Sequence, residues 1–230
     1  MKNNLLNLNV EIINCTLCER LVDHRNTVSQ KKRKAYLSDS YWGKPVPSFG
    51  EIDSSIFILG LAPGAHGSNR TGRMFTGDSS GNLLYPTLYD NELCNQPESL
   101  NIEDGLYLIN CYISAVVRCV PPQNKPTTHE IQTCQRYLLK EIQILKDIKV
   151  VVALGKIAFD QYIKCIKLLG ITIDPKPSFG HNKTYTLSNG ITLISSYHPS
   201  QQNTLTGRLT PKMFNDVFKL AKAISMQNKH

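Results

Sequence analysis

Four short, nearly continuous apolar runs constrain the fold of this chain more than any other feature of its sequence. The runs span residues 55–61, 106–110, 150–154 and 192–196. A strand that is apolar on both faces belongs in a sheet covered on both sides, as parallel sheets are. The sequence therefore predicts a central sheet of four parallel strands.

Helical patterns lie between and after these runs, in segments 83–89, 127–145, 156–169 and 210–224. Thr127 and Glu130 have the spacing of a capping box, which predicts a helix start. Pro86 lies inside the first helical segment and predicts either a kink or a late start. Strands that alternate with helices in this way predict an α/β fold, a three-layer α/β/α sandwich.

Length, charge and hydropathy limit the class of protein. A chain of 230 residues suits one α/β domain. No apolar run approaches the roughly 20 residues of a membrane helix, and the N-terminal residues lack the pattern of a secretion signal. We therefore expect a cytoplasmic protein. The net charge of +8 suits a polyanionic partner without requiring one.

The seven cysteines include four at suggestive spacing. Cys15 and Cys18 form C-x-x-C, and fourteen residues separate Cys119 from Cys134. Four thiolates in a reducing compartment hold zinc or an iron–sulfur cluster. Isolated core cysteines explain the same spacing equally well. Spacing alone leaves these alternatives open.

A glycine-rich stretch, GLAPGAHGSNRTGRMFTGDSSG, follows the first apolar run at residues 60–81. Its glycines let the backbone approach a bound group closely. Ligands of open parallel sheets bind beyond the carboxyl ends of the strands, where this stretch and the segment SYHPSQQN both emerge. The stretch matches neither the dinucleotide fingerprint nor the P-loop pattern, which argues against a nucleotide-binding enzyme.

Three motifs in this order, the glycine-rich stretch, RCVPPQNKPT and HPSQQNTLTGRLTP, together with the four cysteines, resemble the family 5 uracil-DNA glycosylases. These are the microbial iron–sulfur members of the uracil-DNA glycosylase superfamily. The resemblance runs from Cys15 to about Phe218. It implies an α/β/α sandwich in one domain, 1–230, with an N-terminal cluster-binding segment. It also implies a [4Fe–4S] cluster held by Cys15, Cys18, Cys119 and Cys134.

The activity that the resemblance implies is hydrolysis of the bond between a deaminated base and deoxyribose in DNA. Uracil is the expected base, other deaminated bases such as hypoxanthine are expected as well, and the product is an abasic site for base excision repair. The expected partner is DNA containing such a base. We expect a monomer in a prokaryotic cytoplasm, associated with the nucleoid when it acts.

The resemblance also gives roles to three residues. The target base must leave the stack before its glycosidic bond can be reached, and Phe75 would stack on it, although a buried core aromatic is the alternative. His198 would donate a hydrogen bond to the base carbonyl. Asp78 would act as general base or stabilise the cationic sugar, and a helix N-cap is its alternative role.

Further residues complete the expected site. The expected substrate contacts are Gly64, Ala65, His66, Asn124, Ser200 and Gln201, and the expected DNA contacts are Arg70, Arg73, Gln202, Leu205 and Arg208. The two arginines of the glycine-rich stretch either bind phosphate or are solvated. Gln201, Gln202 and Leu205 would fill the space left by the flipped base. The basic run 31–34, followed by Tyr36, contacts phosphates or forms a solvated loop.

Two positions depart from the pattern of related families. Several of those families carry a polar, water-activating residue just before the first-motif proline, where this chain has Leu61 and Ala62. They also place a base-reading Asn where this chain has Ala115. A looser pocket follows, in which Asn124 makes part of the polar contact or is only a turn residue. A cluster-bearing DNA-binding protein without chemistry is therefore the alternative function.

Overall fold

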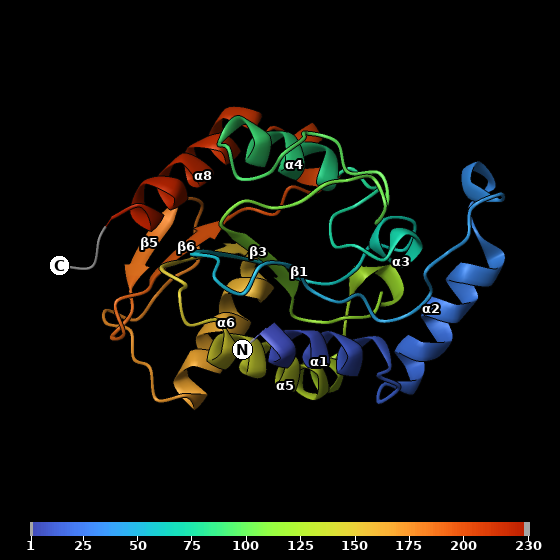
Figure 1. Cartoon of the computed structure of the whole chain (residues 1–230), viewed down its shortest axis with the longest axis horizontal. Helices are drawn as coiled ribbons and strands as arrows, with labels where there is room; N and C mark the ends of the chain where they lie inside the picture. Colours follow the sequence, from blue (N-terminus) through green and yellow to red (C-terminus); the bar gives the residue numbers. More distant parts are fainter. Residues whose placement is uncertain (1, 228–230) are drawn as a thin grey trace.

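A six-stranded sheet forms the centre of the computed structural model, which describes residues 2–227 (Figure 1). In sheet order the strands are β1 (Phe49–Gly50), β3 (Cys111–Ala115), β2 (Ile56–Gly60), β4 (Val150–Leu154), β6 (Thr192–Ser196) and β5 (Lys183–Thr186). The four central strands are parallel, and the two edge strands pair antiparallel. The predicted parallel sheet is thus the centre of a larger mixed sheet. The edge strands were missed because β1 is very short and β5 is mostly exposed, so neither has a long apolar run.

The prediction of a strand at residues 106–110 is wrong, because the strand begins at Cys111. Asn110 adopts a left-handed conformation with φ of +56°, and its side chain accepts the backbone N–H of Ser55 at 2.7 Å. This turn separates the strand from residues 107–109, whose backbone pairs with the segment 93–95 instead of with the sheet. Leu106 and Leu108 lie in a loop, but their side chains are buried in the core, which accounts for the apolar pattern. Leu108 forms only an isolated β-bridge, with Cys94.

The helices are α1 (Lys2–Ile13), α2 (Glu19–Lys31), α3 (Ser68–Thr71), α4 (Gly81–Asp90), α5 (Thr128–Ile144), α6 (Lys156–Leu168), α7 (Gln201–Leu205) and α8 (Pro211–Ser225), with short 3₁₀ turns η1 (Lys34–Tyr36) and η2 (Pro122–Asn124). The predicted capping box of α5 is confirmed by reciprocal bonds between Thr127 and Glu130. The expectation that this helix starts late is wrong, because α4 begins at Gly81 and continues through Pro86.

Two buried cores lie on opposite faces of the sheet. Phe57 and Leu59 of β2 belong to the core that contains side chains of α1, α5 and α6, whereas Ile56 and Ile58 belong to the core under α4 and α8. Figure 1 shows these helices in two layers above and below the strands. The predicted three-layer sandwich is confirmed. The expected domain, 1–230, includes Met1 and residues 228–230, which lie outside the described residues.

The strand order creates a site at the carboxyl end of β2. The chain passes from β2 to β3 on one side and later to β4 on the other side of β2. Such a switch point leaves a crevice where ligands bind in open α/β sheets. The glycine-rich stretch leaves β2 there, and the segments after β3 and β6 emerge at the same edge. Among the described residues, no helix combines the length and apolar character needed to cross a membrane.

Candidate active site

A cleft of about 960 Å³ opens at this edge of the sheet. Its volume is at the upper end of the roughly 300–1,000 Å³ typical of ligand pockets. Its walls come from the glycine-rich stretch, the segment after β3 and the segment after β6. The sequence-predicted residues that line it are Gly64, Ala65, His66, Arg70, Phe75, Asp78, Asn124, His198, Ser200, Gln201 and Gln202. The cleft therefore brings together most of the predicted site.

Phe75 forms part of the cleft wall in a strained conformation. Its φ is +56°, and its side chain is 4% exposed. Its ring packs on Gly60, where an added Cβ would lie 2.7 Å from Cζ, and its centroid is 6.0 Å from that of His198. Strain of this kind costs about 1–3 kcal/mol and concentrates at functional sites. Core packing and contact with a ligand are compatible here, because the buried ring also lines the cleft.

His198 follows β6 and presents a neutral imidazole to the cleft. Its backbone carbonyl accepts a hydrogen bond from Asn203 Nδ2 at 2.8 Å, and Ser200 caps the short helix α7 that follows. Burial lowers the pKa of His198 to about 4. At neutral pH the ring therefore carries one N–H and no charge, so it can donate a hydrogen bond without acting as an acid.

Asp78 uses its two carboxylate oxygens differently. Oδ1 accepts the backbone N–H groups of Ser80 and Gly81 at 3.0 and 3.1 Å, which fixes the start of α4. Oδ2 lies against Gly64 and Gly67, and a Cβ at Gly67 would collide with it. Burial raises the pKa of Asp78, and the two backbone hydrogen bonds oppose that rise. The cap role and a role in the cleft are thus compatible.

A basic rim borders the cleft beside α3. The Arg70 guanidinium lies 4.1 Å over the Tyr36 ring, pairs with Asp39 at 2.8 Å and donates to the His66 carbonyl at 2.8 Å. Arg33 from the basic run 31–34 also lines the cleft. Burial and these two arginines lower the pKa of His66. Arg70 is therefore held at the rim, partly neutralised by Asp39.

Arg73 is a correction to the predicted DNA surface. Its side chain is buried and forms an ion pair with Asp104, and it donates to Ser99 Oγ at 2.8 Å and to Thr76 Oγ1 at 3.0 Å. Each nitrogen of the guanidinium is used within the protein. The prediction that Arg73 contacts phosphate is wrong for this structure, because the residue instead ties the glycine-rich stretch to the segment 99–104.

Leu205 and Arg208 lie outside the cleft walls, beyond the His198 segment. Leu205 is 78% exposed at the end of α7. Arg208 is exposed, and its guanidinium lies 4.6 Å over the Tyr197 ring. An exposed apolar side chain next to a cleft has the properties of a residue that inserts between bases. The roles of both residues in DNA contact stay predictions.

Gln123 is a cleft residue that the sequence interpretation missed. It and Asn124 have φ of +55° and +57°, so two successive non-glycine residues adopt left-handed conformations in the wall. Asn124 is thus a turn residue that also reaches the cleft. The signal was the proline-flanked Gln-Asn pair, of which only Asn commonly adopts this conformation. Ala115 is buried at the end of β3, paired with Gly60.

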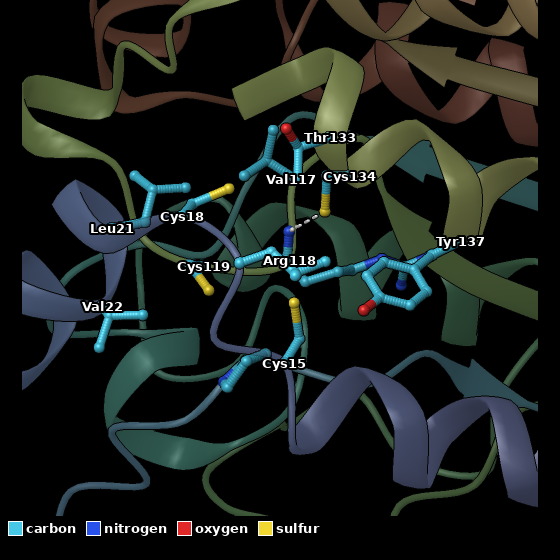
Figure 2. Close-up of a pocket in the computed structure, with 12 residues that line it drawn as sticks. Cys15, Cys18, Leu21, Val22, Val117, Arg118, Cys119, Thr133, Cys134 and Tyr137 are labelled. Atoms are coloured by element: carbon cyan, nitrogen blue, oxygen red, sulfur yellow. Dashed lines mark hydrogen bonds between the residues drawn. The ribbon is translucent and has the colours of Figure 1, made fainter. Parts of the chain in front are cut away.

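The four predicted ligand cysteines line a second, smaller cavity (Figure 2). Cys15 follows α1, Cys18 precedes α2, Cys119 follows β3, and Cys134 lies in α5. Figure 2 shows their sulfur atoms around a common space. The remaining cysteines, Cys94, Cys111 and Cys165, are buried elsewhere in the core. The fold therefore gathers residues from three distant parts of the sequence.

Hydrogen-bond donors surround these sulfur atoms. The Arg118 backbone N–H donates to Cys134 Sγ at 3.4 Å, and Arg25 Nη1 lies 3.5 Å from Cys119 Sγ (Figure 2 shows the former). Burial raises the pKa of Cys119 to about 11 and that of Cys134 to about 12, so both are protonated as free thiols. Donors to sulfur are the usual second layer around thiolate ligands. Among the described residues, no three ligand-type side chains are close enough to hold a single metal ion.

Comparison with known proteins identifies the family. A sequence profile of the Uracil DNA glycosylase superfamily matches residues 47–222. The type-5 uracil-DNA glycosylase of Mycobacterium tuberculosis is 47% identical over 219 residues, covering 95% of this chain and 81% of that protein. The type-5 enzyme of Thermus thermophilus is 47% identical over 211 residues, covering 92% and 94%. That of Pyrobaculum aerophilum is 41% identical over 212 residues, covering 92% and 89%.

The chain therefore belongs to the uracil-DNA glycosylase superfamily. Within the superfamily, the resemblance to family 5 that its motifs predicted is confirmed. The expected class of enzyme, a hydrolase that acts on N-glycosyl bonds, is confirmed with the family.

Proposed function

We propose that this chain acts as a monomer on DNA, removes uracil and leaves an abasic site for base excision repair. One observation carries the proposal: the cleft joins the glycine-rich stretch to the segment after β6, so that Phe75, His198 and Asp78 line one space. Its relatives are named for the same activity. The base enters this space only after it has rotated out of the duplex, because its glycosidic bond is inaccessible in the stack.

Phe75 and His198 bind the flipped base. The Phe75 ring offers a flat apolar surface for stacking. The neutral His198 imidazole donates its N–H to a base carbonyl, and this bond strengthens as the departing base gains negative charge. The protein has already desolvated the ring, so no reorganisation is needed during the reaction. Removing one such donor typically costs about 10²–10³ in kcat.

Asp78 completes the reaction on the sugar side. It is the one carboxylate among the described residues that line the cleft, since Leu61 and Ala62 offer no polar side chain. A water oxygen forms a bond to C1′ of the deoxyribose, and the base leaves with the electron pair of the N-glycosidic bond. The Asp78 carboxylate accepts the proton of the water and stabilises positive charge on the sugar. Its Oδ1 is fixed by two backbone N–H groups, and its Oδ2 lies against Gly64 and Gly67 of the cleft wall.

A wider range of bases is part of the proposal. Ala115 has no side chain that can read the edge of uracil, and the amides of Gln123 and Asn124 stand in the cleft wall instead. Flexible amides offer both donors and acceptors. We therefore extend the proposed substrates to other deaminated bases such as hypoxanthine.

The rim and the α7 region form the proposed DNA surface. Arg70 supplies positive charge at the rim, and the exposed Arg208 supplies it beyond the His198 segment. Gln201 and Gln202 line the cleft. Leu205 is the residue proposed to enter the space left by the flipped base. Phosphate contacts of this kind position the duplex and make binding depend on salt.

The cysteine site is proposed to hold a [4Fe–4S] cluster through Cys15, Cys18, Cys119 and Cys134. The support is a set of four sulfur atoms around one space, with donors to two of them. Iron analysis of the purified protein separates this cluster from a zinc site, because four thiolates can hold either one. The cluster would act as a cross-link between the N-terminal helices and α5, away from the cleft.

The test uses end-labelled duplexes with one central uracil opposite guanine or adenine, and a third duplex with hypoxanthine. Abasic sites are cleaved with alkali after incubation with wild type or Asp78→Asn. We expect cleavage by wild type and a loss of about 10²–10⁴ in rate for Asp78→Asn with retained binding. Equal rates would restrict Asp78 to capping α4. No cleavage of any duplex by wild type would favour the non-catalytic DNA-binding protein.

A further inference from the structure

Arg25 is a buried cation beside the cysteine site. It lies in α2 with 6% of its surface exposed. Its Nη1 is 3.5 Å from Cys119 Sγ and 3.4 Å from the Cys15 carbonyl oxygen. Its Nε is buried and has no hydrogen-bond partner among the described residues. The guanidinium therefore faces two ligand-bearing positions and retains an unused donor.

The charge of Arg25 lacks the compensation that other buried arginines have. Arg118 pairs with Glu141, and Arg73 pairs with Asp104, whereas no carboxylate of the described residues forms a salt bridge with Arg25. A buried charge is costly unless an opposite charge or good hydrogen bonds offset it. Four thiolates around an iron–sulfur centre carry net negative charge, so such a centre would supply the missing partner.

Arg25 also connects the cysteine site to the cleft. Its backbone carbonyl accepts a hydrogen bond from Asn69 Nδ2 at 3.4 Å, and the Asn69 backbone N–H donates to the Gly64 carbonyl at 3.0 Å. Gly64 in turn packs on Asp78. The residue that contacts Cys119 thus sits in the helix that supports the glycine-rich stretch.

We propose that Arg25 is a positioning residue that serves as counter-charge and hydrogen-bond donor to the Cys119 thiolate. The proposal rests on the proposed [4Fe–4S] cluster. A buried cation stabilises the more negative, reduced state of the centre, and hydrogen bonds to sulfur act in the same direction. Arg25 therefore raises the reduction potential and slows the loss of iron. It is not a catalytic residue, because it does not line the cleft.

The experiment compares wild type, Arg25→Gln and Arg136→Gln as purified, iron-loaded proteins. Arg136 is the matched control: it is exposed, its charge acts on the Cys18 thiol, and its Nε bonds only the Thr133 carbonyl. Voltammetry gives the reduction potential, and a chelator assay gives the rate of iron loss. We expect Arg25→Gln to shift the potential to more negative values and to lose iron faster. Arg136→Gln stays near wild type, because solvent screens its charge.

Three outcomes separate the possibilities. An unchanged potential in Arg25→Gln, or an equal shift in both variants, overturns the proposal while the cluster stands. Wild type without iron overturns the cluster itself. If Arg25→Gln does not fold, Arg25→Met decides, because methionine keeps an unbranched side chain that fills buried space but removes both the charge and the donors. A wild-type potential and wild-type iron retention in Arg25→Met then overturn the proposal.

Discussion

The cleft is partly polar, whereas the cysteine site is lined mainly by apolar side chains such as Leu21, Val22 and Val117. The cleft walls contain the left-handed residues Phe75 and Gln123, which cost conformational energy. Three of the four cysteines at the cysteine site lie beside or within the helices α1, α2 and α5, and Cys119 follows β3. Backbone strain is therefore found in the loops that line the cleft, while most of the cysteine site is attached to regular helices.

The cleft and the cysteine site also differ in which charge states of their side chains they favour. In the cleft, burial lowers the pKa of His198 and raises that of Asp78, so both groups move toward their neutral forms. At the cysteine site, the Arg25 side chain and the Arg118 backbone N–H direct hydrogen-bond donors at sulfur atoms, which favours negative charge on sulfur. Burial in the cleft therefore favours neutral side chains, whereas the donors at the cysteine site favour ionised ones.

Cys134→Ala is expected to have the largest effect and asks whether the two regions are separable. The variant removes the one proposed cluster ligand that lies in α5, so we expect the bound iron to fall to background. Cys165→Ala is the control, because Cys165 is also buried but lies outside the cysteine site. Iron content and uracil excision are measured on the same preparations. Excision should fall together with iron, and full excision without iron would show that the cleft needs no support from this site.

His198→Asn tests the cleft without touching the cysteine site. We expect kcat to fall by about 10²–10³, since the proposed hydrogen-bond donor to the base is displaced. Iron content should equal that of wild type. His129→Asn, an exposed change in the first turn of α5, is the control and should leave excision unchanged. A rate within twofold of wild type for His198→Asn would contradict the assigned role.

Gly67→Ala tests the geometry that holds Asp78. The added Cβ would collide with the Asp78 carboxylate and must push it from its place. A displacement of about 1 Å in a catalytic group can cost up to about 10² in rate. Gly180→Ala is the control, because the three atoms nearest to its Cβ would belong to the flexible Lys183 side chain. Excision is measured with binding to an abasic duplex, and we expect excision to fall while binding persists.

The parts of the fold and site that the sequence predicted share one property: their signal is local. The glycine-rich stretch and the His198 segment each follow an apolar run, so the rule for parallel sheets placed both at one edge. The capping box of α5 is equally local. The cysteine site joins segments about a hundred residues apart, and spacing alone left it undecided until the resemblance was considered.

The wrong predictions concern residues whose structural role is set by tertiary contacts. Arg73 has the sequence context of a phosphate contact, but Asp104, thirty-one residues later, binds it internally. Leu106 and Leu108 have the apolar pattern of a strand, yet the left-handed Asn110 starts the strand after them. No local pattern reveals which distant partner a charged or apolar side chain will find.

The smallest effect that we expect is on the pH dependence of stability, to which His198 in the cleft contributes. The pKa of His198 falls from its ordinary value of 6.5 to about 4 on folding. Between these values the unfolded chain binds more protons, so the contribution of His198 is fully present above pH 6.5 and is lost as pH falls toward 4. The raised pKa of Asp78 acts in the opposite direction, because the folded state then holds its proton more tightly.

Urea unfolding at several pH values tests this contribution. The free energy of unfolding should decline less steeply below pH 6.5 for His198→Asn than for wild type. His129→Asn should keep the wild-type slope, and equal slopes in all three proteins would mean that the His198 ring is solvated rather than held neutral in the cleft wall.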